Sequence, residues 1–148
     1  MQALVAYARD VASKRPVSGR ARSPAKPAVL VERLRKICMA LPEATEKLSH
    51  GEPTWFAGKG KVFAMLDDHH HGAAHLSVCL PQPPGRQEML IDAEPERFFR
   101  PAYVGPSGWI GVVLDTGPDW EMVASMVRDA YLHVASRKLR TKLEEGPP

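Results

Sequence analysis

The stretch YVGPSGWIGVVLDTGPDWEMVASMVRDAYLHVASRKL, residues 103–139, decides the fold. In its first half Ile110, Val112 and Leu114 alternate with other residues between two turn signals, which predicts a β-strand. In its second half apolar residues recur at the spacing of one helix face, which predicts an amphipathic helix from Asp119 to Leu139. Asp119 is suited to be the N-cap, because its carboxylate can accept a backbone N–H of the first turn.

The flanking sequence adds further elements to this strand–helix pair. Apolar spacing predicts a first helix at 29–41, and alternation predicts strands at 45–50, 54–57, 61–66 and 75–80. Residues 86–93 predict a short helix and residues 94–99 a further helical turn. We therefore expect an α+β domain in which the N- and C-terminal helices pack on one face of an antiparallel sheet. That face would carry the apolar residues Leu76, Val78, Leu80, Ile110, Val112 and Leu114.

Four pieces of sequence resemble the MmcQ/YjbR family in the same order. They are LPEATE at 41–46, SHGEPTW at 49–55, KVFA at 61–64 and YVGPSGWIGVVLD at 103–115. The resemblance covers about residues 29–139, including PERFF at 95–99. It implies a compact frataxin-like (CyaY-like) fold and DNA binding through two β-wings.

The charge is divided unevenly along the chain. Residues 1–28 carry six basic residues and one acid, whereas residues 29–148 carry 14 basic and 16 acidic residues. We expect a basic, disordered extension at 1–28, with a short helix at Gln2–Ala12, a single domain at 29–142 and a flexible C-terminal tail at 143–148. The composition of the extension fits a dispensable segment, a loose nucleic-acid contact or a mitochondrial presequence.

Four basic residues are candidates for nucleic-acid contact in the domain. Lys59 and Lys61 lie at the tip of a predicted hairpin, and Arg97 and Arg100 flank the pair Phe98 and Phe99. Because the domain itself is slightly acidic, we expect weak, sequence-independent DNA binding in which the basic extension supplies most contacts.

The face opposite the helices suggests a different function. Alternation places His75, Ser77, Cys79, Trp109, Gly111 and Val113 there. An aromatic ring beside a glycine leaves room for a ligand, so Trp109 and His75 are candidates for binding a small molecule or a protein. A domain with only a structural role is the remaining alternative.

Chemistry that depends on metals, cofactors or catalysis is not indicated. The run from His69 to His71 beside two aspartates invites a metal site, but consecutive loop residues rarely aim three side chains at one point. We find no catalytic or phosphate-binding motif and expect neither an enzyme nor a cofactor. Cys38 and Cys79 match no redox spacing, which favours buried thiols in the cytoplasm. The apolar runs are too short for a membrane span, and we expect a monomer.

Overall fold

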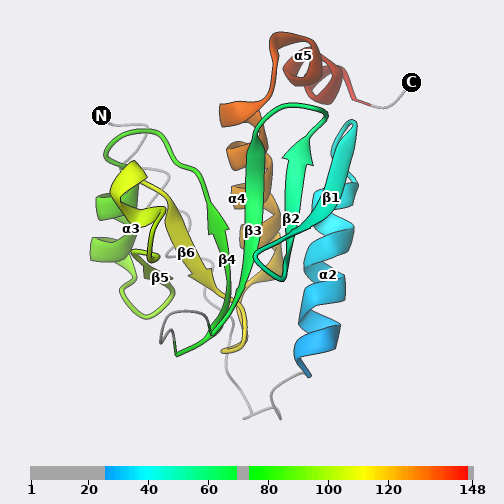
Figure 1. Ribbon diagram of the computed structural model, residues 1–148. Helices are drawn as coiled ribbons and strands as arrows, with labels where there is room; N and C mark the ends of the chain where they lie inside the picture. Colours follow the sequence, from blue (N-terminus) through cyan, green and yellow to red (C-terminus); the bar gives the residue numbers. More distant parts are fainter. Residues whose placement is uncertain (1–25, 70–73, 147–148) are drawn as a thin grey trace.

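The computed structural model describes residues 26–69 and 74–146, and within them it has a six-stranded antiparallel sheet in the order β1-β2-β3-β4-β6-β5. Helices α2 and α4 pack on one face of this sheet (Figure 1). The predicted α+β class, with terminal helices on one face, is confirmed. The elements are α2 (Pro27–Met39), β1 (Ala44–Ser49), β2 (Glu52–Ala57), β3 (Val62–Asp68), β4 (Leu76–Leu80), α3 (Arg86–Ala93), β5 (Phe98–Phe99), β6 (Ile110–Val113), α4 (Trp120–Val134) and α5 (Arg137–Glu145).

Helix α4 begins where the sequence predicts and ends earlier. The Asp119 carboxylate accepts hydrogen bonds from the backbone N–H groups of Glu121 (2.9 Å) and Met122 (3.3 Å). The prediction of one helix up to Leu139 is wrong, because Ala135 adopts an extended backbone (ψ 150°). Ser136 then caps a separate helix, α5, by accepting from the N–H of Leu139. Two helices at an angle therefore replace one long helix.

The ends of the domain differ from the prediction in one further respect. Helix α5 extends to Glu145, so residues 143–145 belong to it, and Leu143 packs against the core. The predicted Gln2–Ala12 helix lies outside the described residues. None of the described helices is long and apolar enough to cross a membrane.

An irregular register between β2 and β3 allows two adjacent residues of β3, Phe63 and Ala64, to be buried in the core. Trp55 pairs with Ala64, but Phe56 pairs with Val62, so Phe63 is an extra residue in β3. Such a bulge turns neighbouring side chains toward one face, and Phe63 and Ala64 are both fully buried. The Phe63 ring meets the Tyr131 ring of α4 edge-on, with centroids 5.2 Å apart.

The hairpin between β1 and β2 is tighter than predicted. The strands predicted at 45–50 and 54–57 leave Gly51-Glu52-Pro53 for the turn, yet β2 already begins at Glu52. The turn is formed by His50 (φ 53°) and Gly51 (φ 81°), both in the left-handed region that a two-residue hairpin turn requires. Gly51 meets this requirement without strain, whereas His50 has a less favourable conformation.

The second face of the sheet is not open around β4 and β6. Ser77 and Cys79 were predicted to point outward to a ligand, but both are buried. The predicted helical turn at 94–99 is also wrong, because Phe98 and Phe99 form β5 and pair with Val112 and Gly111. The Phe99 ring fills the space above Gly111, where an added Cβ would lie within 2.4 Å of it. The room beside the glycine is therefore occupied by the chain itself.

Candidate functional site

The four predicted nucleic-acid contacts do not form one patch. Lys59 and Lys61 are exposed in the turn between β2 and β3, whereas Arg97 and Arg100 flank β5 at one edge of the sheet. Strands β4 and β6 lie between β3 and β5, so roughly 14 Å of sheet separates the two pairs. The hairpin lysines and the arginines therefore belong to different sites.

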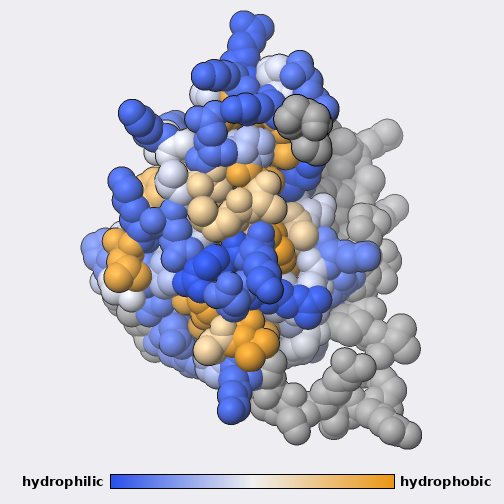
Figure 2. All heavy atoms as spheres, turned by 90° about the vertical axis from the view of Figure 1, so that its right-hand side faces the viewer, coloured by the Kyte–Doolittle hydropathy of each residue, from blue (hydrophilic) through white to orange (hydrophobic). Residues whose placement is uncertain are grey.

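The hairpin lysines lie beside helix α5. The Leu139 side chain of α5 reaches the hairpin at Gly58, where an added Cβ would be 3.2 Å from its Cδ1. Figure 2 shows hydrophilic side chains projecting at the top of the molecule, where α5 lies. We call this cluster of exposed cations the basic end; its members are Lys59, Lys61, Arg137, Lys138, Arg140 and Lys142.

Only one cation of the basic end is paired with an acid among the described residues. The Lys142 Nζ atom lies 3.1 Å from the Glu43 carboxylate. This hydrogen bond and the positive charges of Lys142 and Lys138 lower the pKa of Glu43. The other five cations make no ion pair with any residue that the structure describes.

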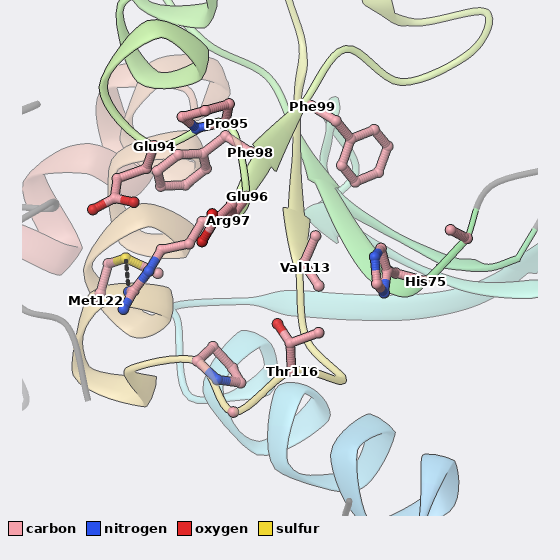
Figure 3. A pocket seen from close by; sticks show the side chains of 13 residues that line it. His75, Glu94, Pro95, Glu96, Arg97, Phe98, Phe99, Val113, Thr116 and Met122 are labelled. Atoms are coloured by element: carbon pink, nitrogen blue, oxygen red, sulfur yellow. Dashed lines mark hydrogen bonds between the residues drawn. The ribbon is translucent and has the colours of Figure 1, made fainter. Parts of the chain in front are cut away.

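Arg97 and His75, predicted for different functions, line one pocket of about 760 Å³. β5 brings Arg97 to this pocket, and the start of β4 brings His75 (Figure 3). Its apolar wall includes Phe99, Val113 and Met122. We call it the Arg97 pocket. The guanidinium is half-buried, and its Nη1 donates to the Met122 sulfur at 3.6 Å.

His75 is held at the rim by an aspartate from the end of β6. Its Nδ1 lies 2.9 Å from one oxygen of Asp115, whose other oxygen accepts from the N–H of Leu76. His69 approaches the same carboxylate at 4.0 Å. No cluster of the described residues is arranged to hold a metal ion. His70 and His71 lie outside the described residues.

Trp109 and Arg100 lie away from the Arg97 pocket. Trp109 is half-buried and precedes β6, and its carbonyl accepts from the Gln87 side chain. Because β4 and β6 are antiparallel, Trp109 and His75 lie at opposite ends of their ladder. The Arg100 side chain packs against Gly105. The register agrees with the predicted shared face, but the two residues are too far apart along the strands to form one site, and a ligand for either stays a prediction.

The second face retains an opening at a different place. A pocket of about 640 Å³ lies between the β1–β2 turn and residues 101–104, over Met65 and Cys79. Burial raises the pKa of the Cys79 thiol to about 12. His50 and Tyr103, on its walls, both have positive φ. Sequence reasoning missed this pocket, because its walls come from segments some fifty positions apart in the chain.

The YjbR family model matches residues 39–133, more than half of the chain. The chain belongs to the YjbR family. The matched part of this YjbR protein runs from the end of α2 almost to the end of α4, so it includes the β2–β3 hairpin and the Arg97 pocket and excludes α5.

A solved structure resembles this YjbR protein in fold. The crystal structure of the Deinococcus radiodurans protein DR2400, with a domain described as DUF419, superposes with a TM-score of 0.61 at 24% identity. The match covers 80% of this chain and 88% of the other. No curated protein matches the sequence. The likeness to DR2400 concerns the fold alone.

Proposed function

We propose that the basic end binds the phosphate backbone of DNA without sequence preference. The observation that carries this proposal is the gathering of five exposed cations, without ion pairs among the described residues, on two adjacent elements. Phosphate contacts by lysine and arginine supply the sequence-independent part of DNA binding. The resemblance of the sequence to a family with proposed β-wings favours the same ligand.

The position of the cations on α5 supports a role other than stability. Arg137 and Lys138 occupy the first helical turn, and Arg140 follows directly. Cations at this end oppose the helix dipole, each at about 0.3–1 kcal/mol. Backbone N–H groups at the same end add to the attraction for an anion. A bound polyanion would offset the repulsion between these cations and the helix dipole. The fold itself does not need cations at this end of the helix.

The shape of the site argues for weak binding that does not read bases. The β2–β3 turn is short, and α5 lies against the hairpin through Leu139 instead of projecting as a recognition helix. The domain as a whole is slightly acidic, with 14 basic and 16 acidic residues at 29–148, which limits the affinity. Helix α2 begins at the bottom of Figure 1, at the opposite end of the domain from α5.

Titration of short DNA duplexes of unrelated sequence at several salt concentrations tests the proposal. The slope of log K against log salt reports phosphate contacts at about 0.9 per contact. We expect neutralisation of α5 to weaken binding and reduce the slope; the variant is R137Q/K138Q/R140Q. A control with the same change in net charge should have a smaller effect; it is K26Q/R100Q/R128Q.

Neutralising the basic extension tests the competing hypothesis that the extension, and not the basic end, binds DNA. This variant replaces Arg9, Lys14, Arg15, Arg20 and Arg22 by glutamine in the full chain. If it abolishes the salt dependence while the α5 variant binds as the parent does, the extension is the binding element and the proposal is wrong. If the α5 and control variants weaken binding equally, only net charge matters and the site is not at the basic end.

A further inference from the structure

Arg97 has an environment unlike that of the cations at the basic end. Its guanidinium is half-buried, and its side-chain contact is a 3.6 Å hydrogen bond to the thioether of Met122, a weak acceptor. It makes no ion pair with the described residues. Most N–H donors of the guanidinium therefore have no acceptor among the described residues. Two parallel N–H groups of a guanidinium can bind both oxygens of one carboxylate.

The Arg97 pocket has the size and the lining of a small-molecule site. Its volume of about 760 Å³ falls within the range usual for such sites. Phe99 supplies half-exposed apolar surface, Val113 and Met122 lie almost fully buried in the wall, and Thr116 adds a hydroxyl. A ligand with an apolar body and one polar group would match both the apolar side chains and the polar side chains of this pocket.

Two carboxylates restrict the charge of the ligand. Glu96 is exposed and lines the pocket next to Arg97 in sequence. Glu94 is 3% exposed and takes part in an interaction of its own. A ligand with several negative charges would be repelled by Glu96, whereas a single carboxylate can reach Arg97. Nucleic acid, with a charge on every phosphate, does not fit this pocket.

We propose that the Arg97 pocket binds a small monocarboxylate with an apolar body. Arg97 holds the carboxylate through two parallel N–H···O bonds, and the apolar body lies against Phe99 and Val113. This site is separate from the basic end, so it stands whether or not the protein binds DNA.

Phenylacetate serves as the probe, with neutral phenylacetamide as its matched isostere. In a ¹⁵N NMR titration of the full chain, we expect saturable shifts of the amides of Phe98, Val113 and Thr116 on adding phenylacetate. A probe of this size should bind with Kd in about the millimolar range. Phenylacetamide should bind about tenfold or more weakly, because it cannot form the charged pair.

Substitution of Arg97 provides the second arm. R97M should weaken phenylacetate binding about tenfold or more, and R97K, which keeps the charge without the fork, should fall in between. The matched control is R100M, which should leave the affinity unchanged because Arg100 does not line the pocket. The proposal is overturned if phenylacetate gives no saturable shifts at these amides, if the amide binds as tightly as the acid, or if R97M, folded by its own spectrum, keeps the parent affinity.

Discussion

The two faces of the sheet are closed in different ways. On one face the long helices α2 and α4 bury a continuous apolar surface from Leu30 to Leu139. On the other face a two-residue strand and the segment that follows it provide the cover, with the Phe99 ring over Gly111 as the clearest contact. Two pockets remain: the Arg97 pocket at the β5 edge, with Met122 of α4 in its wall, and a second pocket that residues 101–104 line. The long helices bury the apolar core and so stabilise the fold. The short strand β5 and the irregular segment after it cover their side less completely and leave space for ligands.

The helix face should respond most strongly to a buried charge. Val127→Asp places a carboxylate at a fully buried position of α4, and we expect a loss of about 4 kcal/mol or more in the free energy of unfolding. Denaturant unfolding measures it. Ser125→Asp, two residues away on the exposed side, is the control and should change stability by less than about 0.5 kcal/mol. Equal stability of the two variants would show that α4 does not cover the sheet.

Sequence patterns predicted most of this face. The spacing of the α4 residues, the Asp119 cap and the bounds of α3 were all visible locally. The end of α4 was missed because Leu139 continues the apolar spacing, although Ser136 is a favourable N-cap. The extended backbones of Ala135 (ψ 150°) and Ser136 (ψ 161°) separate the two helices.

The second face and its pocket were less predictable. The PERFF sequence contains helix-forming residues, and pairing with β6 makes two of its residues a strand. Arg97 and His75 were each recognised as candidates, but their shared pocket depends on that pairing. The basic residues of α5 were visible in the sequence, whereas the contact of Leu139 of α5 with the hairpin at Gly58 was not. The relation to frataxin-like proteins stays a prediction.

The two cysteines allow the faces to be compared chemically. Cys38 lies on the buried side of α2 and Cys79 on the second face of the sheet, and burial raises the pKa of both thiols. For Cys79 the pKa rises from 9.0 to about 12, which lowers the reactive thiolate fraction about a thousandfold. We expect C38S, which leaves only Cys79, to react with a thiol reagent far more slowly than a free cysteine does. C79S, which leaves Cys38, should also react far more slowly than a free cysteine, because burial raises the pKa of this thiol as well. Fast labelling of Cys79 would mean that the short cover does not close the face.

A side chain at Gly111 tests the cover directly. Gly111→Val would bring a Cβ into the Phe99 ring, and we expect a loss of about 1–3 kcal/mol in the free energy of unfolding. Thermal or denaturant unfolding gives the value. The double variant with Phe99→Ala should lose less than the sum of the single variants, because the ring is no longer in the way. If the losses in unfolding free energy of the two single variants simply add in the double variant, the clash does not involve the Phe99 ring.

The smallest expected effect concerns one hydrogen bond on the helix face. The Tyr131 hydroxyl donates to the Pro42 carbonyl at 2.6 Å. Tyr131→Phe removes this bond and keeps the ring, so we expect a loss of about 1 kcal/mol in unfolding free energy. Phe63→Leu, which alters the neighbouring ring contact without touching the bond, separates packing from hydrogen bonding. An unchanged midpoint for Tyr131→Phe would show that water replaces the bond at no cost.

The strand order also bears on the path by which the chain folds. Strands β1 to β4 are neighbours in sequence and in the sheet, so each of these pairings closes only a short loop. Helices α2 and α4 are separated by the whole sheet in sequence, yet they must meet to complete the core. Contacts between distant segments form late, since loop closure costs entropy before they contribute stability. We therefore expect the four-stranded meander to be organised in the folding transition state and the docking of α2 onto α4 to be the final step, an order that φ-values for β3 and α2 would measure.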